Sequence, residues 1–241
     1  MDFWLKNKVA LVVGATKNIG RAVAVELVNH GCKVVAVGRD RAQLDSLNTY
    51  ASQSIDLMPR EAVKRLTDWV HIKAGVPDII VHAIGGSDGH VASWGESEEW
   101  EKVWRLNLGI PHDINREFIS GMVKKRYGRI VHFSSVSVTA HNGYAPYASA
   151  KHAVEGYVQR MSREVSKNGV IMTCVRPGSF PVKGRGLGLL DDEQRNEYFD
   201  RYLPINRFGE VLEIAKLVAF LCSDHASYMP GSIIPIDGGH R

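Results

Sequence analysis

Short apolar runs alternate along this chain with longer stretches in which apolar residues recur at helical spacing. The apolar runs fall at 9–13, 33–37, 78–82, 129–133 and 170–175. Runs of this length are typical of buried strands. Helical patterns at about 97–125 and 146–167 lie between the later runs. The alternation predicts an α/β fold, with a single doubly wound Rossmann-type parallel sheet of about seven strands and helices on both faces.

The length of the chain suits one large core. Its 241 residues, 44% of them hydrophobic, predict a single domain over residues 1–241. Only 16 residues separate Gly38 from Ile55, so the second helix and the third strand are expected to be short. Right-handed crossovers bring the carboxyl ends of the strands to one edge, where a ligand crevice is expected.

A glycine-containing turn, Gly14 to Gly20, joins the first predicted strand to the first predicted helix. Gly31 ends that helix just before the next strand, which completes a βαβ unit. In such a turn the backbone can approach a pyrophosphate, and the unpaired N–H groups of the first helical turn face the anion. The arrangement predicts a dinucleotide site.

Tyr147 and Lys151 stand four positions apart in a predicted helix, so their side chains share one face. Moving a phenol pKa from about 10 to neutrality requires about 4 kcal/mol. An ammonium about 4 Å away supplies that order at an effective dielectric of about 20. We therefore expect Lys151 to lower the pKa of Tyr147. By itself such a pair is more often a solvated surface contact, so the neighbouring motifs decide.

Seven motifs, in order, resemble those of the short-chain dehydrogenase/reductase family, and the resemblance covers nearly the whole chain. They are Gly14 to Gly20, Asp56-Leu57, Asn107 in Leu-Asn-Leu, Ser134-Ser135, Tyr147 with Lys151, Arg176-Pro177-Gly178 and Ile236-Asp237-Gly238-Gly239. The resemblance implies an NADP(H)-preferring oxidoreductase of the carbonyl or ketoacyl reductase type.

The resemblance also implies the catalytic roles. Tyr147 is expected to donate a proton to the substrate carbonyl oxygen, and Ser135 to hold that oxygen. Lys151 is expected to lower the phenol pKa and to bind the nicotinamide ribose, while Asn107 helps to hold a water between Lys151 and solvent. Ser134 is the alternative to Ser135, because family serines lie twelve or thirteen residues before the tyrosine; the second serine of the pair is the usual one.

Cofactor contacts are expected along the same edge of the sheet. The positions that match family contacts are Gly14, Thr16, Lys17, Asn18, Ile19, Gly20, Arg39, Asp56, Leu57, Ala83, Gly85, Tyr147, Lys151, Pro177, Gly178 and Ser179.

Charge around Gly38 favours NADPH/NADP+ over NAD. Members that use NAD usually carry an acid at the end of the second strand, where this chain has Gly38. Arg39 and Lys17 resemble the two cations that flank the 2′-phosphate in NADP(H)-preferring members, and a guanidinium binds phosphate bidentately. Asp40 would repel the phosphate if its carboxylate faced the ribose. Alternatively, Arg39 and Asp40 are only a solvated pair in a loop.

Several positions depart from the family pattern. Asn18 stands in place of the second glycine of the turn, and it tolerates a left-handed backbone better than most residues. The stretch from His82 to Gly85 replaces Asn-Asn-Ala-Gly. His82 is expected to be a packed, hydrogen-bonded core histidine; the alternative is a titratable group near the cofactor. Val182 replaces a threonine that contacts the carboxamide, which leaves that contact to backbone groups or to Ser179.

The family's mobile substrate segment corresponds to about residues 183–208. Its basic residues are Lys183, Arg185, Arg195 and Arg201. They are compatible with an anionic substrate, although such charges are more often a solvated helix face. Trp94, His141 and Tyr144 are expected at the mouth of the pocket and indicate a polar or ring-bearing ketone.

The leading hypothesis is an NADPH-dependent reductase that converts a ketone to an alcohol. The alternatives are an NAD(P)-dependent alcohol or sugar dehydrogenase, a lyase or epimerase that uses the nucleotide transiently, and a non-catalytic nucleotide sensor. A lyase or epimerase typically has a further substrate domain, and a sensor is expected to have lost Tyr147 or Lys151.

Composition bounds the partners. The formal net charge of +4 and the lack of a basic cluster with aromatics argue against nucleic acid binding. The three cysteines are well separated in apolar runs, so neither a metal site nor a disulfide framework is expected. No apolar stretch of about 18 residues is present, and a cytoplasmic location with a small-molecule partner is expected. The resemblance implies a homotetramer or homodimer.

Overall fold

The computed structural model describes residues 3–87, 89, 92–140, 143–182 and 186–240. In these residues seven strands form one parallel sheet in the order β3-β2-β1-β4-β5-β6-β7. The elements in chain order are β1 (Val9–Val13), α1 (Asn18–Asn29), β2 (Lys33–Gly38), α2 (Arg41–Asp45), β3 (Ala51–Ser54), α3 (Arg60–Ala74), β4 (Ile79–His82), α4 (Ser97–Trp104), η1 (Arg105–Gly109), α5 (Ile110–Lys125), β5 (Gly128–Phe133), η2 (Val136–Val138), α6 (Ala145–Val165), η3 (Ser166–Asn168), β6 (Val170–Pro177), η4 (Gly186–Leu189), α7 (Asp192–Tyr202), α8 (Val211–Leu221), η5 (Asp224–Ala226) and β7 (Ile233–Ile236). The predicted fold class is confirmed.

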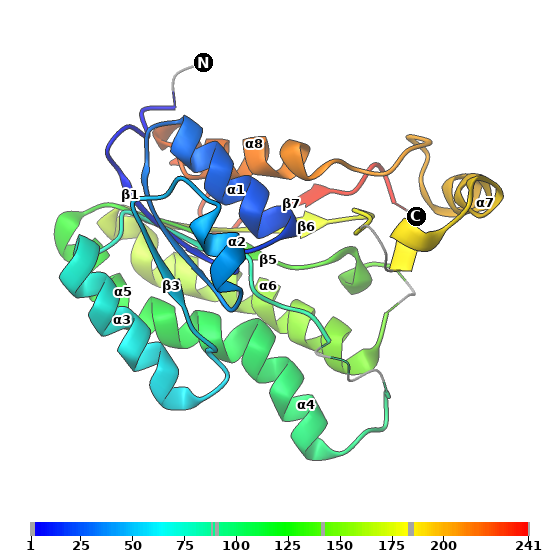
Figure 1. Ribbon diagram of the computed structural model, residues 1–241, viewed down its shortest axis with the longest axis horizontal. Coiled ribbons are helices and arrows are strands. Elements are labelled where there is room, and N and C mark those ends of the chain that lie inside the picture. The colour runs from blue at the N-terminus through cyan, green and yellow to red at the C-terminus, as the bar shows by residue number, and fades with distance from the viewer. Residues whose placement is uncertain (1–2, 88, 90–91, 141–142, 183–185, 241) are drawn as a thin grey trace.

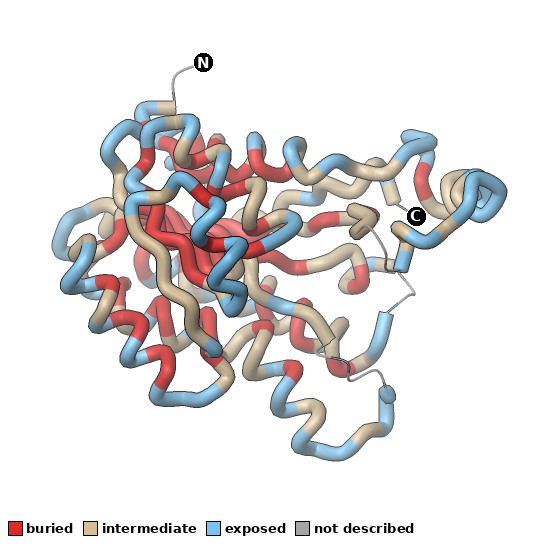
Figure 2. The backbone as a smooth tube through the Cα atoms, in the orientation of Figure 1, coloured by how far each residue is buried: buried red, intermediate tan, exposed pale blue. Residues whose placement is uncertain are grey.

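Helices cover both faces of the sheet, as Figure 1 shows. Helices α1 and α8 pack on one face, and α3, α5 and α6 pack on the other. The central strands are buried from both sides, which explains why their sequences are nearly continuous apolar runs. Most buried backbone in Figure 2 lies in this sheet and on the inward faces of its helices. In the described part no helix is both long and apolar enough to cross a membrane.

One predicted helix is interrupted. The pattern predicts a continuous helix over about 97–125, whereas the structure has α4 and α5 separated by the π-helical turn η1. Pro111 explains the break, because it has no N–H for the carbonyl of Asn107 and its ring crowds that carbonyl. The shortened second helix and third strand are present as predicted, with five residues in α2 and four in β3.

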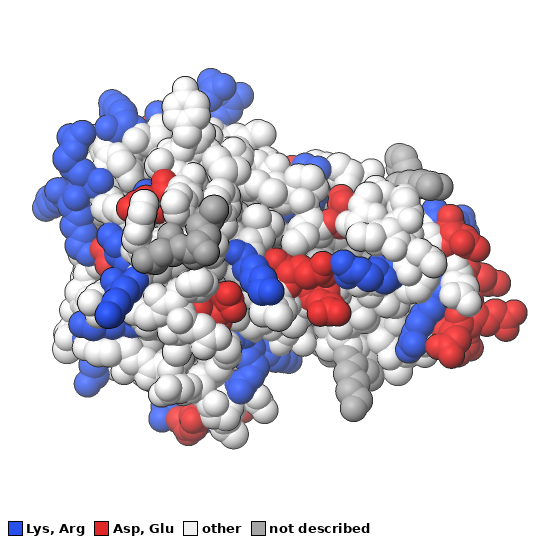
Figure 3. Space-filling model, turned by 90° about the horizontal axis from the view of Figure 1, so that it is seen from above, with Lys and Arg blue, Asp and Glu red and all other residues white. Residues whose placement is uncertain are grey.

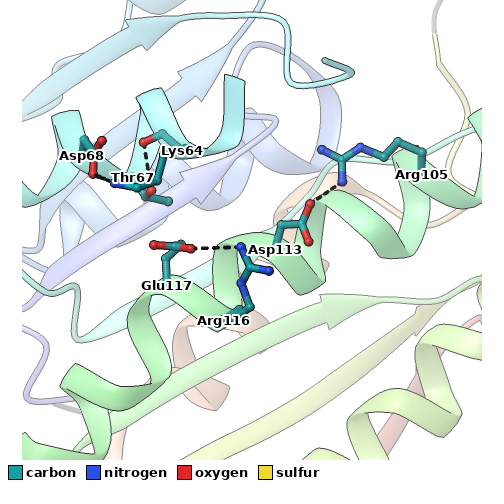
Figure 4. A network of polar contacts seen from close by, with 7 residues as sticks. All are labelled: Lys64, Thr67, Asp68, Arg105, Asp113, Arg116 and Glu117. Carbon is teal, nitrogen blue, oxygen red and sulfur yellow. Dashed lines mark hydrogen bonds and ion pairs between the residues drawn. The ribbon is translucent and has the colours of Figure 1, made fainter. Parts of the chain in front are cut away.

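Exposed ion pairs lie on the outer surface of the layer that contains α3 and α5. Figure 4 shows Lys64 with Asp68 on α3, and Arg116 with Glu117 on α5. Pairs of this kind contribute at most about 1 kcal/mol each, because water screens them. The half-buried pair of Arg105 and Asp113 is different, since the same guanidinium also donates to backbone carbonyls after β3.

The stability of this layer depends on apolar packing. Phe118 of α5 is fully buried in the core between the sheet and α3, α5 and α6. We predict that Phe118→Ala lowers the free energy of unfolding by about 3–5 kcal/mol, because it removes apolar contacts and leaves a cavity. Urea unfolding measures the change. Ile72→Ala is the control, because Ile72 is 82% exposed and should change stability by no more than about 0.5 kcal/mol. Equal losses in the two variants would contradict the assignment of the core.

A chain of buried polar side chains runs between the sheet and the helices α5 and α6. His82 and His132 are partners across β4 and β5, and their rings lie 4.6 Å apart. Asn115 links them: its Oδ1 lies 2.8 Å from His82 Nε2, and its Nδ2 lies 3.1 Å from His132 Nε2. The same amide nitrogen donates to the hydroxyl of Tyr157 at 3.3 Å. The expectation that His82 is a packed, hydrogen-bonded core histidine is confirmed.

The Asn115 amide fixes which nitrogen of each ring carries the proton. Its oxygen accepts from His82 Nε2, and its nitrogen donates to His132 Nε2, which must therefore be unprotonated. His82 Nδ1 is buried without a hydrogen-bond partner. Burial lowers the pKa of His82 to about 4 and holds the pKa of His132 well below its usual range. Both imidazoles are consequently neutral in the folded protein at pH 7.

These histidines predict a loss of stability in acid. His82 is protonated near pH 6.5 in the unfolded chain but only near pH 4 in the folded chain. Its contribution to the free energy of unfolding is therefore complete above pH 6.5 and is lost as the pH falls towards 4. We predict that this group alone lowers the free energy of unfolding by about 2 kcal/mol between pH 7 and pH 5. Urea unfolding at both values measures the slope, which His82→Asn should flatten. An unchanged slope in that variant would contradict the prediction.

Candidate active site

The carboxyl ends of β1, β4, β5 and β6 bring the predicted site residues together. A Cβ added at Gly14, after β1, would lie 2.6 Å from the carbonyl oxygen of Ala83, after β4. A Cβ at Gly85 would lie 2.7 Å from Asn107 Oδ1 and 2.9 Å from Lys151 Nζ. The two predicted glycines therefore lie where only a residue without a side chain fits.

The turn from Gly14 to Gly20 forms a cradle at the start of α1. Gly14 has φ +92°, and a Cβ at Gly20 would lie 2.1 Å from the Gly14 oxygen. Asn18 has φ +50°, a left-handed backbone that asparagine tolerates better than most residues. Helix α1 begins there without a side-chain cap on its first N–H groups. A close backbone, absent side chains and free N–H groups are the features that suit a pyrophosphate.

The neighbouring turn residues are held from β2. A Cβ at Gly38 would lie 2.4 Å from Thr16 Cγ2, so the glycine leaves room for the buried threonine. Lys17 and Arg39 are both exposed. The Asp40 carboxylate accepts from the backbone N–H of Gln43 at 3.1 Å and caps α2. The Asp40 carboxylate, which could repel a phosphate, is therefore hydrogen-bonded to the start of α2.

The residues after β3 are fixed by local contacts. Asp56 is exposed, and its Oδ1 accepts from the backbone N–H of Met58 at 3.1 Å. Leu57 is buried, and its carbonyl accepts from Arg105 Nη2 at 3.5 Å. The Asp-Leu motif thus forms a turn that the η1 arginine supports.

Asn107 lies in the interior and not on the surface of its helix. It is 2% exposed. Its Oδ1 accepts from Gly86 N at 3.1 Å, and its Nδ2 donates to the carbonyls of Gly86 at 2.7 Å and Val103 at 2.8 Å. The amide therefore clamps the backbone after β4 against η1, next to Lys151.

Lys151 is a buried cation. The residue is 3% exposed, and its Nζ donates to the Phe133 carbonyl at 2.8 Å. Burial lowers the pKa of Lys151 to about 8. The ammonium lies 5.5 Å from the centroid of the Tyr147 ring, so the helix brings the two residues together on one face as predicted.

The expected lowering of the Tyr147 pKa by Lys151 is wrong for this structure. Burial raises the pKa of Tyr147, and the hydrogen bond with Ser135 opposes the rise. The simple charge estimate neglects two effects: the phenol is itself desolvated, and the ammonium is directed to the carbonyl of Phe133. Tyr147 is therefore a neutral phenol at pH 7 with its hydroxyl against Ser135.

The structure separates the two serines of the Ser-Ser pair. Ser135 bonds Tyr147, and its Oγ accepts from Ser137 N at 3.2 Å. Ser134 is buried, and its Oγ donates to Glu155 Oε1 at 2.6 Å. Of the two hydroxyls, the one at Ser135 is thus the one beside the phenol. Sequence reasoning missed Glu155, although its position one turn after Lys151 was a usable signal.

The end of β6 packs against the chain after β7. Pro177 is buried, and a Cβ at Gly178 would lie 2.5 Å from Asp237 Cα. The hydroxyls of Ser179 and Tyr198 are 2.8 Å apart, so α7 is attached to the strand end. Sequence reasoning missed this contact of Tyr198, because it joins residues 19 positions apart across a loop.

The charges of the substrate segment do not gather towards the site. Helix α7 has no buried residue, and its Arg195 pairs with exposed Asp192. Figure 3 shows acidic side chains together with basic ones at the end of the molecule where α7 lies. The described part of the segment therefore fits the solvated helix face better than an anion site. Residues 183–185 and His141 lie outside the described residues, while Trp94 and Tyr144 are 92% and 48% exposed.

No group of three or more His, Cys, Asp or Glu side chains that could hold a metal ion is found in the part of the chain that the structure describes. The cysteines Cys32, Cys174 and Cys222 are buried and free. The chemistry that this arrangement offers is proton transfer by Tyr147 next to a cradle for a pyrophosphate.

Comparisons with known proteins give the same family. A family model described as "Enoyl-(Acyl carrier protein) reductase" matches residues 14–241. The 3-oxoacyl-[acyl-carrier-protein] reductase FabG of Vibrio cholerae is 32% identical over 241 residues, and that of Haemophilus influenzae is 30% identical over 241 residues. In both cases 98% of this chain and 98% of the relative are covered.

Solved structures share the whole fold. L-sorbose reductase from Gluconobacter frateurii, complexed with NADPH and L-sorbose, has a TM-score of 0.89 and 25% identity, covering 99% of this chain and 98% of that chain. A 7α-hydroxysteroid dehydrogenase complexed with NADH and 7-oxo glycochenodeoxycholic acid has a TM-score of 0.90 at 23% identity, covering 99% of this chain and 96% of that one. The second likeness concerns the fold alone.

The family match covers residues 14–241, a range that includes the glycine cradle, Ser135, Tyr147 and β7. It agrees with the strand order and with relatives that are aligned over nearly their full length. The chain therefore belongs to the short-chain dehydrogenase/reductase family of oxidoreductases.

Proposed function

We propose that this protein reduces a ketone to an alcohol with NADPH, and that Tyr147 donates the proton. The observation that carries the proposal is the Tyr147 ring 5.5 Å from the buried Lys151 ammonium, with Ser135 beside the phenol, at the same sheet edge as the glycine cradle. A proton donor and an oxygen-holding hydroxyl next to a dinucleotide site are the groups that carbonyl reduction needs.

The side chains divide the work as follows. Ser135 holds the substrate oxygen in position for the phenol, and Tyr147 transfers its proton to that oxygen. The bound nicotinamide supplies the hydride. Lys151, with a pKa of about 8, is mostly charged at pH 7, and its ammonium would bind the nicotinamide ribose. Asn107 keeps the backbone at Gly85 and Gly86 in place beside that ammonium.

Reduction is the direction that we propose, and oxidation of an alcohol or sugar is the reverse reaction at the same groups. A phenol that keeps its proton at pH 7 is ready to donate it, whereas oxidation requires a phenolate that accepts one. The chain has both Tyr147 and Lys151, and the ammonium lies 5.5 Å from the centroid of the phenol ring. A non-catalytic sensor is expected to have lost one of these residues.

The residues around the cradle support NADPH as the cofactor. Lys17 follows Thr16, which lies against Gly38, and Arg39 follows Gly38 in the chain. Both are exposed, and Asp40 is occupied with capping α2. The backbone of Gly14 to Gly20 would hold the pyrophosphate. L-sorbose reductase, a structural relative, was solved with NADPH, and the FabG relatives act on 3-oxoacyl groups carried by acyl carrier protein.

A panel of carbonyl compounds tests the function. We propose that the panel contain 3-oxoacyl thioesters and ketoses, with NADPH oxidation followed by absorbance and NADH measured in parallel. Turnover of one class with NADPH supports the proposal and names the substrate. Tight NADPH binding without turnover of any compound would favour a sensor instead.

Tyr147→Phe provides a direct test of the proton donor. We predict that turnover of the ketone falls by at least about 10²-fold, since the ring stays and only the transferable proton is lost. The dissociation constant of NADPH, measured by fluorescence titration, should stay within about twofold. Tyr228→Phe is the matched control, because Tyr228 is 98% exposed. Turnover retained in Tyr147→Phe would refute the assignment.

Replacing both cations near Gly38 tests the choice of cofactor. We predict that the double variant Lys17→Ala with Arg39→Ala binds NADPH at least about tenfold more weakly, because two charge-assisted contacts to the 2′-phosphate are lost. Binding of NADH, which lacks that phosphate, should change by less than about twofold. Titration of both nucleotides gives the comparison, and equal losses would contradict the 2′-phosphate site.

A further inference from the structure

We propose that Glu155 and Arg176 are positioning residues that fix Ser135 through the hydroxyl of Ser134. This inference rests on the proposed function, in which Ser135 holds the substrate oxygen. It assigns a role to an ion pair that lies behind the site and takes no part in the proton transfer.

Ser134, Glu155 and Arg176 form a cluster that three hydrogen bonds link. Arg176 Nε donates to Glu155 Oε1 at 2.8 Å, and Arg176 Nη2 donates to Oε2 at 2.7 Å. Ser134 Oγ donates to Glu155 Oε1 at 2.6 Å. The bidentate guanidinium leaves the carboxylate one orientation, and the carboxylate in turn leaves the serine hydroxyl one rotamer.

Each member of the cluster adjoins a residue of the proposed site. Ser134 precedes Ser135, Glu155 follows Lys151 by one helical turn, and Arg176 precedes Pro177. The cluster therefore joins the ends of β5 and β6 to α6.

Phe133, the last residue of β5, and the two residues that follow it each contact one residue of the same face of α6. The Phe133 carbonyl accepts from Lys151, the Ser134 hydroxyl donates to Glu155, and Ser135 bonds Tyr147. The helix partners are spaced by four positions, so they form one row facing the strand. The middle contact fixes the backbone between the two that serve the chemistry.

Burial distinguishes this pair from the ordinary ion pairs of the surface. The side chains of Arg176 and Glu155 are 20% and 12% exposed, whereas the similarly bidentate Arg207 and Glu213 are 48% and 40% exposed. Half-buried pairs add little net stability over apolar residues of the same size, but they specify one geometry. Here the geometry that is specified is that of the strand end carrying Ser135.

The test removes only the link. In Ser134→Ala the ion pair remains and the hydroxyl is lost. We expect kcat for the ketone to fall about tenfold or more, because small displacements of an aligned group are costly, while the dissociation constant of NADPH stays within about twofold. The matched control is Ser162→Ala, another buried α6-to-strand hydrogen bond, with Oγ donating to the Met172 carbonyl at 3.0 Å, which lies outside the site. It should leave kcat unchanged.

Two readouts separate positioning from a general loss of stability. If Ser134 acts through Ser135, the double variant Ser134→Ala with Ser135→Ala has the kcat of Ser135→Ala alone. Amide hydrogen exchange at Ser137, whose N–H bonds Ser135 Oγ, should accelerate about tenfold in Ser134→Ala and not in Ser162→Ala. The proposal would be overturned if the loss of kcat in the double variant equals the product of the losses in the two single variants. Unchanged amide exchange at Ser137 in Ser134→Ala would overturn it as well. A wild type that reduces no ketone defeats the proposed function, and the exchange measurement then still decides the positioning.

Discussion

The buried ammonium of Lys151 is the constraint on which the rest of the site depends. An isolated charge in the interior loses several kcal/mol of hydration, and the lowering of its pKa to about 8 reflects that loss. The ammonium persists because the Phe133 carbonyl accepts from it. Space around it is limited, since a Cβ at Gly85 would lie 2.9 Å from Nζ. Asn107 then fixes the following residue, so the backbone after β4 cannot shift without exposing or crowding the charge.

The same charge connects the site to the sheet. The carbonyl that Lys151 uses belongs to the last residue of β5, and its place is set by the parallel pairing of β5 with β4 and β6. Beneath it, burial keeps His132 neutral, and Asn115 donates to its Nε2. A second cation at that position would act against the ammonium, which is one of the influences that keep the pKa of His132 low. The neutral state of His132 in the core and the charge of Lys151 in the site therefore depend on each other.

Much of this structure could be predicted from the sequence, and the failures have physical causes. Strands buried on both faces are apolar throughout, so their pattern is unambiguous, and the motifs fall at their ends in order. The π turn was missed because periodicity alone gave no break, although Pro111 shows one. The direction of the Tyr147 pKa was missed because desolvation depends on burial that a sequence does not contain. The pairing of Glu155 with Arg176 spans 21 positions and requires the fold.

The choice between the two serines shows how the fold assigns chemistry. Ser134 and Ser135 follow β5, and their hydroxyls contact different residues of α6. Ser135 lies beside Tyr147, whereas the Glu155 carboxylate accepts from the Ser134 hydroxyl and is itself held by Arg176. The spacing to the tyrosine admits both serines, and the carboxylate removes one of them. An apolar residue at position 155 would leave the Ser134 hydroxyl without its acceptor, so under the proposed function the choice of the oxygen-holding serine depends on a residue twenty positions away.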